Sequence, residues 1–193
     1  MCIRDRILTS GLLAQVFMMA EGIDIGKPSE EIIFQKKLDR YIDNAKEILS
    51  KYKDEIVVPL DYACTENGRV EINVNELPSR SPITDIGSKT IGLYKEEIAK
   101  AKTVFTNGPA GVFEKQASEL GTKELFSQIA RSDNFSVVGG GDSISAVNKY
   151  GLKNGFSYIC TGGGAMVRFL SGEELPVVKS LKKSAEKFKK SNV

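Results

Sequence analysis

The sequence predicts an α/β fold in which helices cover both faces of a largely parallel sheet. Two observations indicate it: short apolar runs alternate with segments of helix length, and three of the runs end in glycine-rich turns. Parallel strands need crossovers of that length. We therefore predict a three-layer, Rossmann-like domain. The runs and the turns that follow them are residues 104–106 and 107–109, 137–138 and 139–141, and 158–161 and 162–164.

The N-terminal apolar stretch, residues 7–20, predicts a strand, a turn and a helix. Polar and small residues, among them Ser10 and Gly11, interrupt it, and it is too short to span a bilayer. Both points favour a buried strand-turn-helix passage over the alternative of a signal peptide. We expect the helix to cover residues 12–20 and to be closed by Gly22.

The middle of the chain predicts further elements from the spacing of its apolar residues. Apolar residues at helical spacing indicate a helix, and strict alternation indicates a half-exposed strand. The expected elements are a turn at residues 26–28, an amphipathic helix at 38–49, a buried strand at 56–60, an alternating strand at 70–74, a loop at 78–82, a helix ending near residue 100, and a helix at 121–131.

The two ends of the chain differ from the part between them. Residues 1–6 match no pattern that we can interpret and are set apart as a leader, and we place the domain in residues 7–176. Residues 177–193 are lysine-rich with an apolar stripe at helical spacing, which predicts a solvated tail helix. Leu175 and Pro176 mark an expected hinge where the tail leaves the domain.

Composition limits the function. The chain has 193 residues, 41% of them hydrophobic and 27% charged, which predicts one globular domain. The net charge is only +2, from 27 Lys and Arg against 25 Asp and Glu, so no overall field attracts nucleic acid. We therefore expect any anion site to be local, with no nucleic-acid partner and no membrane partner.

Two residue counts exclude whole classes of chemistry. The sequence has no histidine, which removes the usual general base, the common zinc ligand and every Ser-His-Asp or Cys-His arrangement. Its three cysteines, Cys2, Cys64 and Cys160, are far apart and form no Cys-x-x-Cys pair, so neither a disulfide framework nor a metal knuckle is indicated. We expect a reducing, cytoplasmic location.

The three glycine-rich turns predict where a ligand binds. Parallel strands joined by right-handed crossovers place every strand-to-helix loop at one edge of the sheet, so the turns are expected to converge. Glycines let backbone N–H groups approach an oxyanion, and helix N-termini add unpaired donors and a positive dipole end. This combination indicates a phosphate site.

Two familiar glycine motifs fail in this sequence. A dinucleotide fingerprint needs a third glycine, but Ile144 and Val167 stand where it belongs in the two glycine triplets. Residues 87–90 have the sequence Gly-Ser-Lys-Thr, as at the end of a P-loop, yet the upstream glycine is absent. The simpler interpretation is that these residues begin a helix.

Two carboxylates allow alternative interpretations. Asp142 follows a glycine triplet, where it could hold a phosphate-bound Mg²⁺ directly or through water, or could cap the helix. Capping does not require three glycines, which favours the metal. Glu114, six residues after Gly108, is either a surface carboxylate or a ligand for ribose hydroxyls.

Three segments together resemble the C-terminal nucleotide-binding domain of the phosphoglycerate kinases. They are residues 107–114 (NGPAGVFE), 139–143 (GGGDS) and 161–165 (TGGGA), in this order. Residues 85–90 and 170–176 also resemble family segments, so the likeness covers nearly everything from residue 7 to the last helix.

The resemblance implies a Mg²⁺-bound ADP or ATP at the predicted strand edge. Ser10 and Gly11 stand in the turn beside the adenine, where the family usually has two glycines. The other implied positions are Asn107, Gly108 and Pro109 along the nucleotide, Glu114 on the ribose, Gly140, Gly141, Asp142 and Ser143 around the phosphates with Asp142 serving the metal, and Gly141, Gly162, Gly163 and Gly164 toward the transferring phosphoryl group.

The resemblance also implies a reaction and a missing part. The family transfers a phosphoryl group between 1,3-bisphosphoglycerate and ADP and is monomeric at full length, and its 3-phosphoglycerate site lies on a separate N-terminal domain. That domain, and the phosphate-contacting lysines that precede the segment matching Ile7, are absent from this sequence. We expect the chain to bind adenine nucleotide weakly, to meet 3-phosphoglycerate only through the absent domain, and not to turn over alone.

Two other functions compete with this one. A Rossmann-type oxidoreductase or methyltransferase domain would bind NAD or S-adenosylmethionine, but the broken glycine fingerprints count against it. A non-catalytic phosphate-binding module would use the glycines only for close packing of strand against helix. It predicts that Asp142→Ala leaves nucleotide affinity unchanged.

Overall fold

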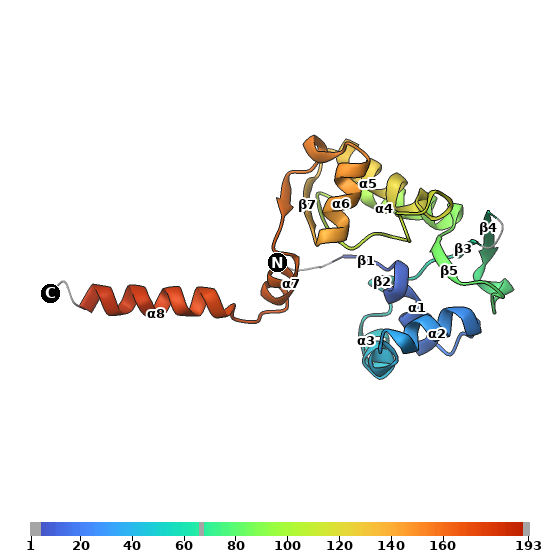
Figure 1. Cartoon of the computed structure of the whole chain (residues 1–193), viewed down its shortest axis with the longest axis horizontal. Helices are drawn as coiled ribbons and strands as arrows, with labels where there is room; N and C mark the ends of the chain where they lie inside the picture. The colour runs from blue at the N-terminus through green and yellow to red at the C-terminus, as the bar shows by residue number, and fades with distance from the viewer. Residues whose placement is uncertain (1–4, 66–67, 191–193) are drawn as a thin grey trace.

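The computed structural model describes residues 5–65 and 68–190, and within them short strands alternate with helices (Figure 1). Two parallel sheets confirm the predicted α/β class. The first pairs β1 (Ile7–Leu8) with β2 (Ile56–Val57), and the second has the order β6 (Thr103–Asn107), β7 (Phe135–Gly139), β8 (Tyr158–Cys160).

A third sheet was not foreseen from the sequence. It is antiparallel and has the order β4 (Arg69–Asn73), β3 (Asp61–Thr65), β5 (Ile83–Ile86). The alternating strand predicted at residues 70–74 corresponds to β4, whereas β3 carries no alternation because four of its five residues are buried. A strand buried on both faces gives no periodic signal in sequence.

The helices lie around these sheets, and four of them match the predicted ranges closely. The bounds are α1 (Gly11–Ala20), α2 (Lys27–Gln35), α3 (Ile42–Tyr52), α4 (Ser88–Lys100), α5 (Leu120–Arg131), α6 (Gly141–Lys149), α7 (Gly163–Leu170) and α8 (Pro176–Lys190).

Two predicted boundaries are wrong for reasons that the structure shows. The turn expected at residues 26–28 is the start of α2, because Pro28 falls in the first helical turn, where its missing N–H group costs nothing. Gly26 precedes it with a φ of +89°, which favours glycine. The strand expected over residues 56–60 ends at Val57, before Pro59.

Two clusters of buried side chains form the core. One surrounds β7 and includes residues of α4, α5 and α6, and the other joins α1, α2 and α3 to β3. The buried Tyr94 of α4 connects β1 with β2, since its hydroxyl lies 2.7 Å from the Thr9 carbonyl and 2.9 Å from the Val57 carbonyl. Of the strands that precede the glycine-rich turns, β7 lies in the first cluster through Val138, and Val104 of β6 and Ile159 of β8 pack against that cluster.

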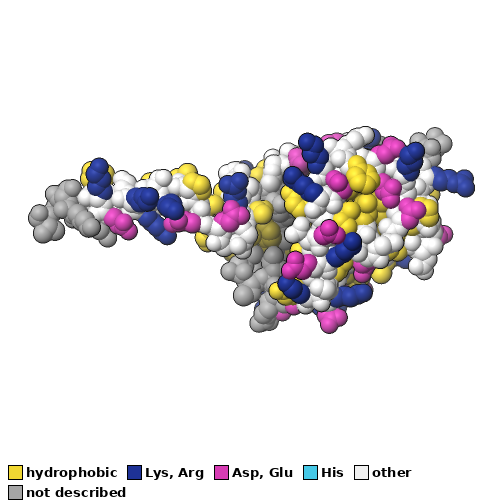
Figure 2. All heavy atoms as spheres, turned by 90° about the horizontal axis from the view of Figure 1, so that it is seen from below, with side chains coloured by type: hydrophobic (Ala, Val, Ile, Leu, Met, Phe, Trp, Pro, Cys, Tyr) yellow, Lys and Arg dark blue, Asp and Glu magenta, His cyan; other side chains and the backbone are white. Residues whose placement is uncertain are grey.

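The surface differs between the body and the C-terminal helix. Acidic and basic side chains are interspersed over the face of the body shown in Figure 2, in keeping with the small net charge. Helix α8 extends away from the body (Figure 1), and its Leu181 and Phe188 are 65% and 67% exposed. None of the helices in the described ranges combines the length and apolar character needed to cross a membrane.

Candidate functional site

The three glycine-rich turns lie at one edge of the β6-β7-β8 sheet. In the parallel register Asn107 pairs with Gly139 and Gly139 pairs with Cys160, so all three strands end at the same level. The predicted convergence of the turns is confirmed.

Close backbone contacts join the turns to one another. A Cβ on Gly163, at the start of α7, would lie 2.6 Å from the Cα of Gly140. A Cβ on Gly140 would lie 2.9 Å from Oδ1 of Asn107, and Gly140 also has a φ of +94°. Side chains at these two positions would push the turns apart, so glycine is required for the backbones to meet.

Helices α6 and α7 direct free donors toward this junction. The first hydrogen bond within α6 runs from the N–H of Ile144 to the carbonyl of Gly140, and the first within α7 runs from Met166 to Gly162. The N–H groups that precede these bonds have no partner inside the helix. Two helix N-termini with glycine-lined approaches form a site suited to phosphate oxygens.

Ser143, one of the residues expected around the phosphates, also joins α6 to the 107–109 turn. Its side chain is buried, and its Oγ accepts a hydrogen bond from the N–H of Gly108 at 2.7 Å. The side chain therefore holds the 107–109 turn against α6. The hydroxyl keeps its own proton as a donor, so Ser143 can offer a phosphate both this O–H group and its backbone N–H group in the first turn of the helix.

Asp142 lies in the first turn of α6 with its side chain exposed. The N-cap of this helix is Gly140, so Asp142 is not the capping residue. Within the described ranges no three His, Cys, Asp or Glu side chains cluster closely enough to hold a metal. One carboxylate beside a phosphate site fits Mg²⁺, which is commonly bound through one or two carboxylates, water and substrate phosphates.

The segment that follows Asn107 runs past the start of α1. Gly11 has a φ of +57°, and a Cβ on it would lie 3.5 Å from the carbonyl oxygen of Pro109. The predicted Ser10-Gly11 turn and the 107–109 turn are therefore neighbours. Glu114 lies further along this segment with its side chain exposed.

Anchors that sequence reasoning missed hold the segment in place. The N–H of Val112 donates to the carbonyl of Thr84 at 2.8 Å, and the N–H of Ala110 donates to Oγ1 of Thr122 at 3.0 Å. Lys149 donates from Nζ to the Phe113 carbonyl at 2.7 Å. These anchors lie 12 to 36 residues from the groups they bind, so no local signal in the sequence identifies them.

Met166 of α7 is a further residue that the sequence did not indicate. A Cβ on Gly139 would overlap Cε of Met166, so the methionine side chain lies directly against the backbone of this glycine. Its flexible, apolar side chain fills the space beside the junction of β7 and α7. Gly139 thus packs against Met166, and a Cβ there would displace the flexible end of the methionine side chain rather than the backbone.

The Gly-Ser-Lys-Thr segment is closed to a phosphate. It begins α4, as predicted, and the carboxylate of Asp61 accepts hydrogen bonds from the N–H groups of Thr90 at 2.8 Å and Lys89 at 3.0 Å. A Cβ on Gly87 would overlap this carboxylate. The N-terminus of α4 already holds an anion from within the protein.

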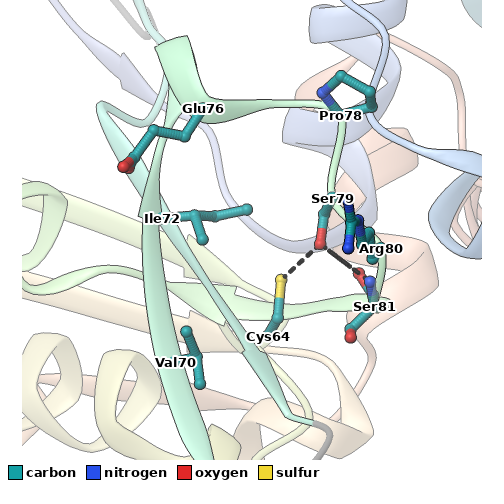
Figure 3. Close-up of a pocket in the computed structure, with 8 residues that line it drawn as sticks. All are labelled: Cys64, Val70, Ile72, Glu76, Pro78, Ser79, Arg80 and Ser81. Atoms are coloured by element: carbon teal, nitrogen blue, oxygen red, sulfur yellow. Dashed lines mark hydrogen bonds between the residues drawn. The ribbon is translucent and has the colours of Figure 1, made fainter.

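A cavity of about 320 Å³ lies at the β3-β4 hairpin and includes none of the predicted site residues (Figure 3). Cys64 and Ser79 face each other there, with Sγ 3.2 Å from Oγ, and Ser79 donates to the Ser81 carbonyl at 2.6 Å. Burial raises the pKa of the Cys64 thiol, which keeps it protonated and unreactive. A second pocket, of about 580 Å³, is lined by Gly164, Arg168 and residues 175–178.

Comparison with known proteins identifies phosphoglycerate kinases as relatives. The family model described as phosphoglycerate kinase matches residues 1–173. The phosphoglycerate kinase of Methanothermus fervidus is 45% identical over 184 residues, covering 95% of this chain and 45% of that protein, and that of Methanococcus maripaludis is 47% identical over 188 residues, covering 96% and 45%.

Solved structures agree with the sequence relatives. The crystal structure of phosphoglycerate kinase from Pyrococcus horikoshii OT3 superimposes with a TM-score of 0.87 at 43% identity, over 95% of this chain and 46% of that one. The structure of phosphoglycerate kinase from Coxiella burnetii gives 0.79 at 33% identity, over 91% and 46%. The chain spans about half the length of the curated relatives it matches.

Proposed function

This chain belongs to the phosphoglycerate kinase family, and on that premise we propose that it is the nucleotide-binding half of an enzyme that transfers a phosphoryl group reversibly between 1,3-bisphosphoglycerate and ADP. The products of the forward reaction are 3-phosphoglycerate and ATP. The observation that carries the proposal is the meeting of three strand-to-helix turns, with Gly163 against Gly140 and Gly108 bonded to Ser143.

Each part of the junction has a role in binding Mg²⁺-ADP or Mg²⁺-ATP. The Ser10-Gly11 turn and residues 107–109 lie along the base and ribose, and Glu114 accepts from the ribose hydroxyls. The N–H groups of residues 140–143 bind phosphate oxygens, and Asp142 provides the carboxylate for Mg²⁺. The start of α7, residues 162–164, faces the phosphoryl group in transfer.

The reaction requires the protein to position the reactants and to stabilise charge, and it requires no general base. A β-phosphate oxygen of ADP attacks the phosphorus of the acyl phosphate, and the bond from phosphorus to the carboxyl oxygen breaks, so that the electron pair leaves with the carboxylate. The nucleophile is already ionised, which agrees with a chain that has no histidine. The helix N-termini stabilise the charge on the transferring group, and Mg²⁺ neutralises phosphate charge when the nucleotide is bound.

The rest of the reaction belongs to the part of the relatives that this chain does not match. There the 3-phosphoglycerate site is expected, and closure of the two halves brings the substrates together. We expect this chain alone to bind nucleotide weakly without turnover, and the full-length protein to act as a monomer in the cytoplasm.

Calorimetric titration of the chain with Mg²⁺-ADP, Mg²⁺-ATP and NAD tests the proposal. We expect saturable binding of the two adenine nucleotides and none of NAD. Binding of NAD alone would favour an oxidoreductase, and the absence of any binding would contradict the proposal.

A substitution at Asp142 tests whether its carboxylate binds Mg²⁺. We expect Asp142→Ala to weaken Mg²⁺-ADP binding about tenfold, and to have little effect on ADP binding measured in EDTA. Asp133→Ala, another exposed aspartate, is the matched control and should bind as the wild type does. An unchanged affinity in Asp142→Ala would favour the non-catalytic phosphate module.

A further inference from the structure

Helix α6 contacts the segment of residues 108–113 at both of its own ends. In the first turn, Oγ of Ser143 accepts from the N–H of Gly108 at 2.7 Å. In the last turn, Nζ of Lys149 donates to the carbonyl of Phe113 at 2.7 Å. The segment is thus fixed at its start and its end by one helix.

The bond from Lys149 acts on the peptide group that joins Phe113 to Glu114. That peptide is planar, so a bond to the Phe113 carbonyl also sets the direction of the Glu114 N–H group and limits the position of its Cα. Glu114 has an exposed side chain with no part in the core. Its placement therefore depends on the backbone that carries it.

Further contacts hold the ammonium group of Lys149. Nζ lies 2.6 Å from Oε2 of Glu119, and it lies 6.0 Å from the centroid of the Phe113 ring and 5.5 Å from that of the Tyr150 ring. A carboxylate and two aromatic rings around one ammonium restrict a side chain that is otherwise flexible. Lys149 thus has a defined position although its side chain is 39% exposed.

The helix between the two contacts is anchored in the core. Ala146 and Val147 are fully buried in the core between Ser143 and Lys149. Six helical steps separate the two contacts, a distance of about 9 Å along the axis. The two contacts are therefore held by one short helix that is packed into the core.

We propose that Lys149 is a positioning residue for nucleotide binding, which orients Glu114 toward the ribose from the same helix whose first turn binds the phosphates. The inference rests on the proposed function. With Lys149 in this role, α6 sets the distance between the phosphate contacts and the ribose contact.

The test compares Mg²⁺-ADP with Mg²⁺-2′,3′-dideoxy-ADP by calorimetry on the whole chain. The dideoxy nucleotide lacks the hydroxyls that Glu114 would bind, so the wild type should bind it about tenfold more weakly than ADP. In Lys149→Met we expect this ratio to fall to about twofold, with the affinity for the dideoxy nucleotide unchanged. Lys149→Arg, which keeps a charged donor, should retain most of the ratio.

A matched control separates positioning from general stability. Lys153, a few residues further on, is exposed, and Lys153→Met should keep the wild-type ratio. A Lys149→Met variant that retains the full ratio, or that loses affinity equally for both nucleotides, would overturn the inference. Wild-type protein that does not bind Mg²⁺-ADP would instead refute the proposed function.

A second variant covers the case in which Lys149→Met does not fold. Glu119→Gln removes the carboxylate beside the ammonium but leaves Lys149 in place, and we expect it to reduce the ratio about twofold. An unchanged ratio in Glu119→Gln, with Lys149→Met unfolded, would also count against the positioning role.

Discussion

Two helix starts in this protein resemble each other in sequence and differ in what they bind. Helices α4 and α6 each follow a buried strand, and each has a glycine as its N-cap residue, Gly87 and Gly140. At α4 the carboxylate of Asp61 receives the N–H groups of Lys89 and Thr90. At α6 the free N–H groups face the junction of three glycine-rich turns.

The difference shows what decides whether a helix N-terminus is a ligand site. Both starts have unpaired donors and a positive dipole end, which favour an anion. Asp61 comes from β3, 29 residues before Thr90, and supplies that anion from within the fold. The start of α6 is surrounded instead by glycines, by the Asn107 amide and by Ser143, whose side chain is bonded to Gly108, and none of these groups carries a negative charge.

Removing the internal anion is the strongest test of this comparison. Asp61 is buried and accepts three hydrogen bonds from Thr90 and Lys89, so Asp61→Ala should lower the free energy of unfolding by about 3 kcal/mol. The affinity for Mg²⁺-ADP should not change in the folded variant. Urea denaturation followed by circular dichroism measures the stability.

Asp54→Ala is the control for this variant. The Asp54 side chain is exposed, and its removal should change the free energy of unfolding by less than about 0.5 kcal/mol. If Asp61→Ala were as stable as Asp54→Ala, the carboxylate would not be needed at α4 and the comparison would fail.

A second test adds one methyl group where the three glycine-rich turns meet, which we call the open junction. In Gly163→Ala the new Cβ would meet the backbone of Gly140, so we expect a loss of about 1–2 kcal/mol in the free energy of unfolding. Mg²⁺-ADP binding should weaken tenfold or more, because the two turns must move apart. Thermal unfolding and calorimetry measure the two effects.

A glycine-to-alanine substitution in α4 is expected to have the opposite effect on the free energy of unfolding. Gly92 lies inside α4 with open space around its Cβ position, so Gly92→Ala should stabilise the protein by about 0.5–1 kcal/mol and leave nucleotide binding unchanged. Equal effects of the two substitutions would show that Gly163 is not in close backbone contact.

The open junction could be predicted from the sequence. The reason why the start of α4 is closed to a ligand could not. Glycines after three apolar runs are a local signal, and parallel topology places them together. The bond from Asp61 to Thr90 depends on the antiparallel sheet, which the sequence did not reveal because β3 is buried on both faces. The P-loop interpretation was rejected from the missing glycine and because residues 87–90 more simply begin a helix, and neither argument identified Asp61 as the group bound there.

The candidate site also shows that the sequence reveals local features but not contacts between distant segments. Gly140 and Gly163 stand out in the sequence, whereas Lys149 and Met166 do not, because their roles depend on contacts between distant segments. Ser143 was identified for the phosphates, but the hydrogen bond that its hydroxyl accepts from Gly108 was not foreseen. A motif thus locates the backbone of a site more reliably than it assigns the side chains.

The prediction with the smallest expected effect concerns the ion pair between Lys149 and Glu119. It tests whether this pair stabilises residues 108–113, as the Asp61 carboxylate stabilises the start of α4. The hydrogen bond and ion pair with Lys149 keep the pKa of Glu119 below its usual value. The carboxylate binds its proton less readily in the folded state, so its contribution to stability is complete above the unfolded pKa of about 4.3 and is lost as the pH falls through the lower folded pKa.

We therefore expect Glu119→Gln to be slightly less stable than the wild type at pH 6, by less than about 1 kcal/mol because the pair is partly exposed. The difference should shrink as the pH falls below about 4.3, and it should disappear once the wild-type carboxylate has bound its proton in the folded state as well. Urea denaturation of both proteins across this range measures it. A difference that stays constant with pH would mean that the segment is held by its backbone anchors at Thr84 and Thr122 and not by the charge pair.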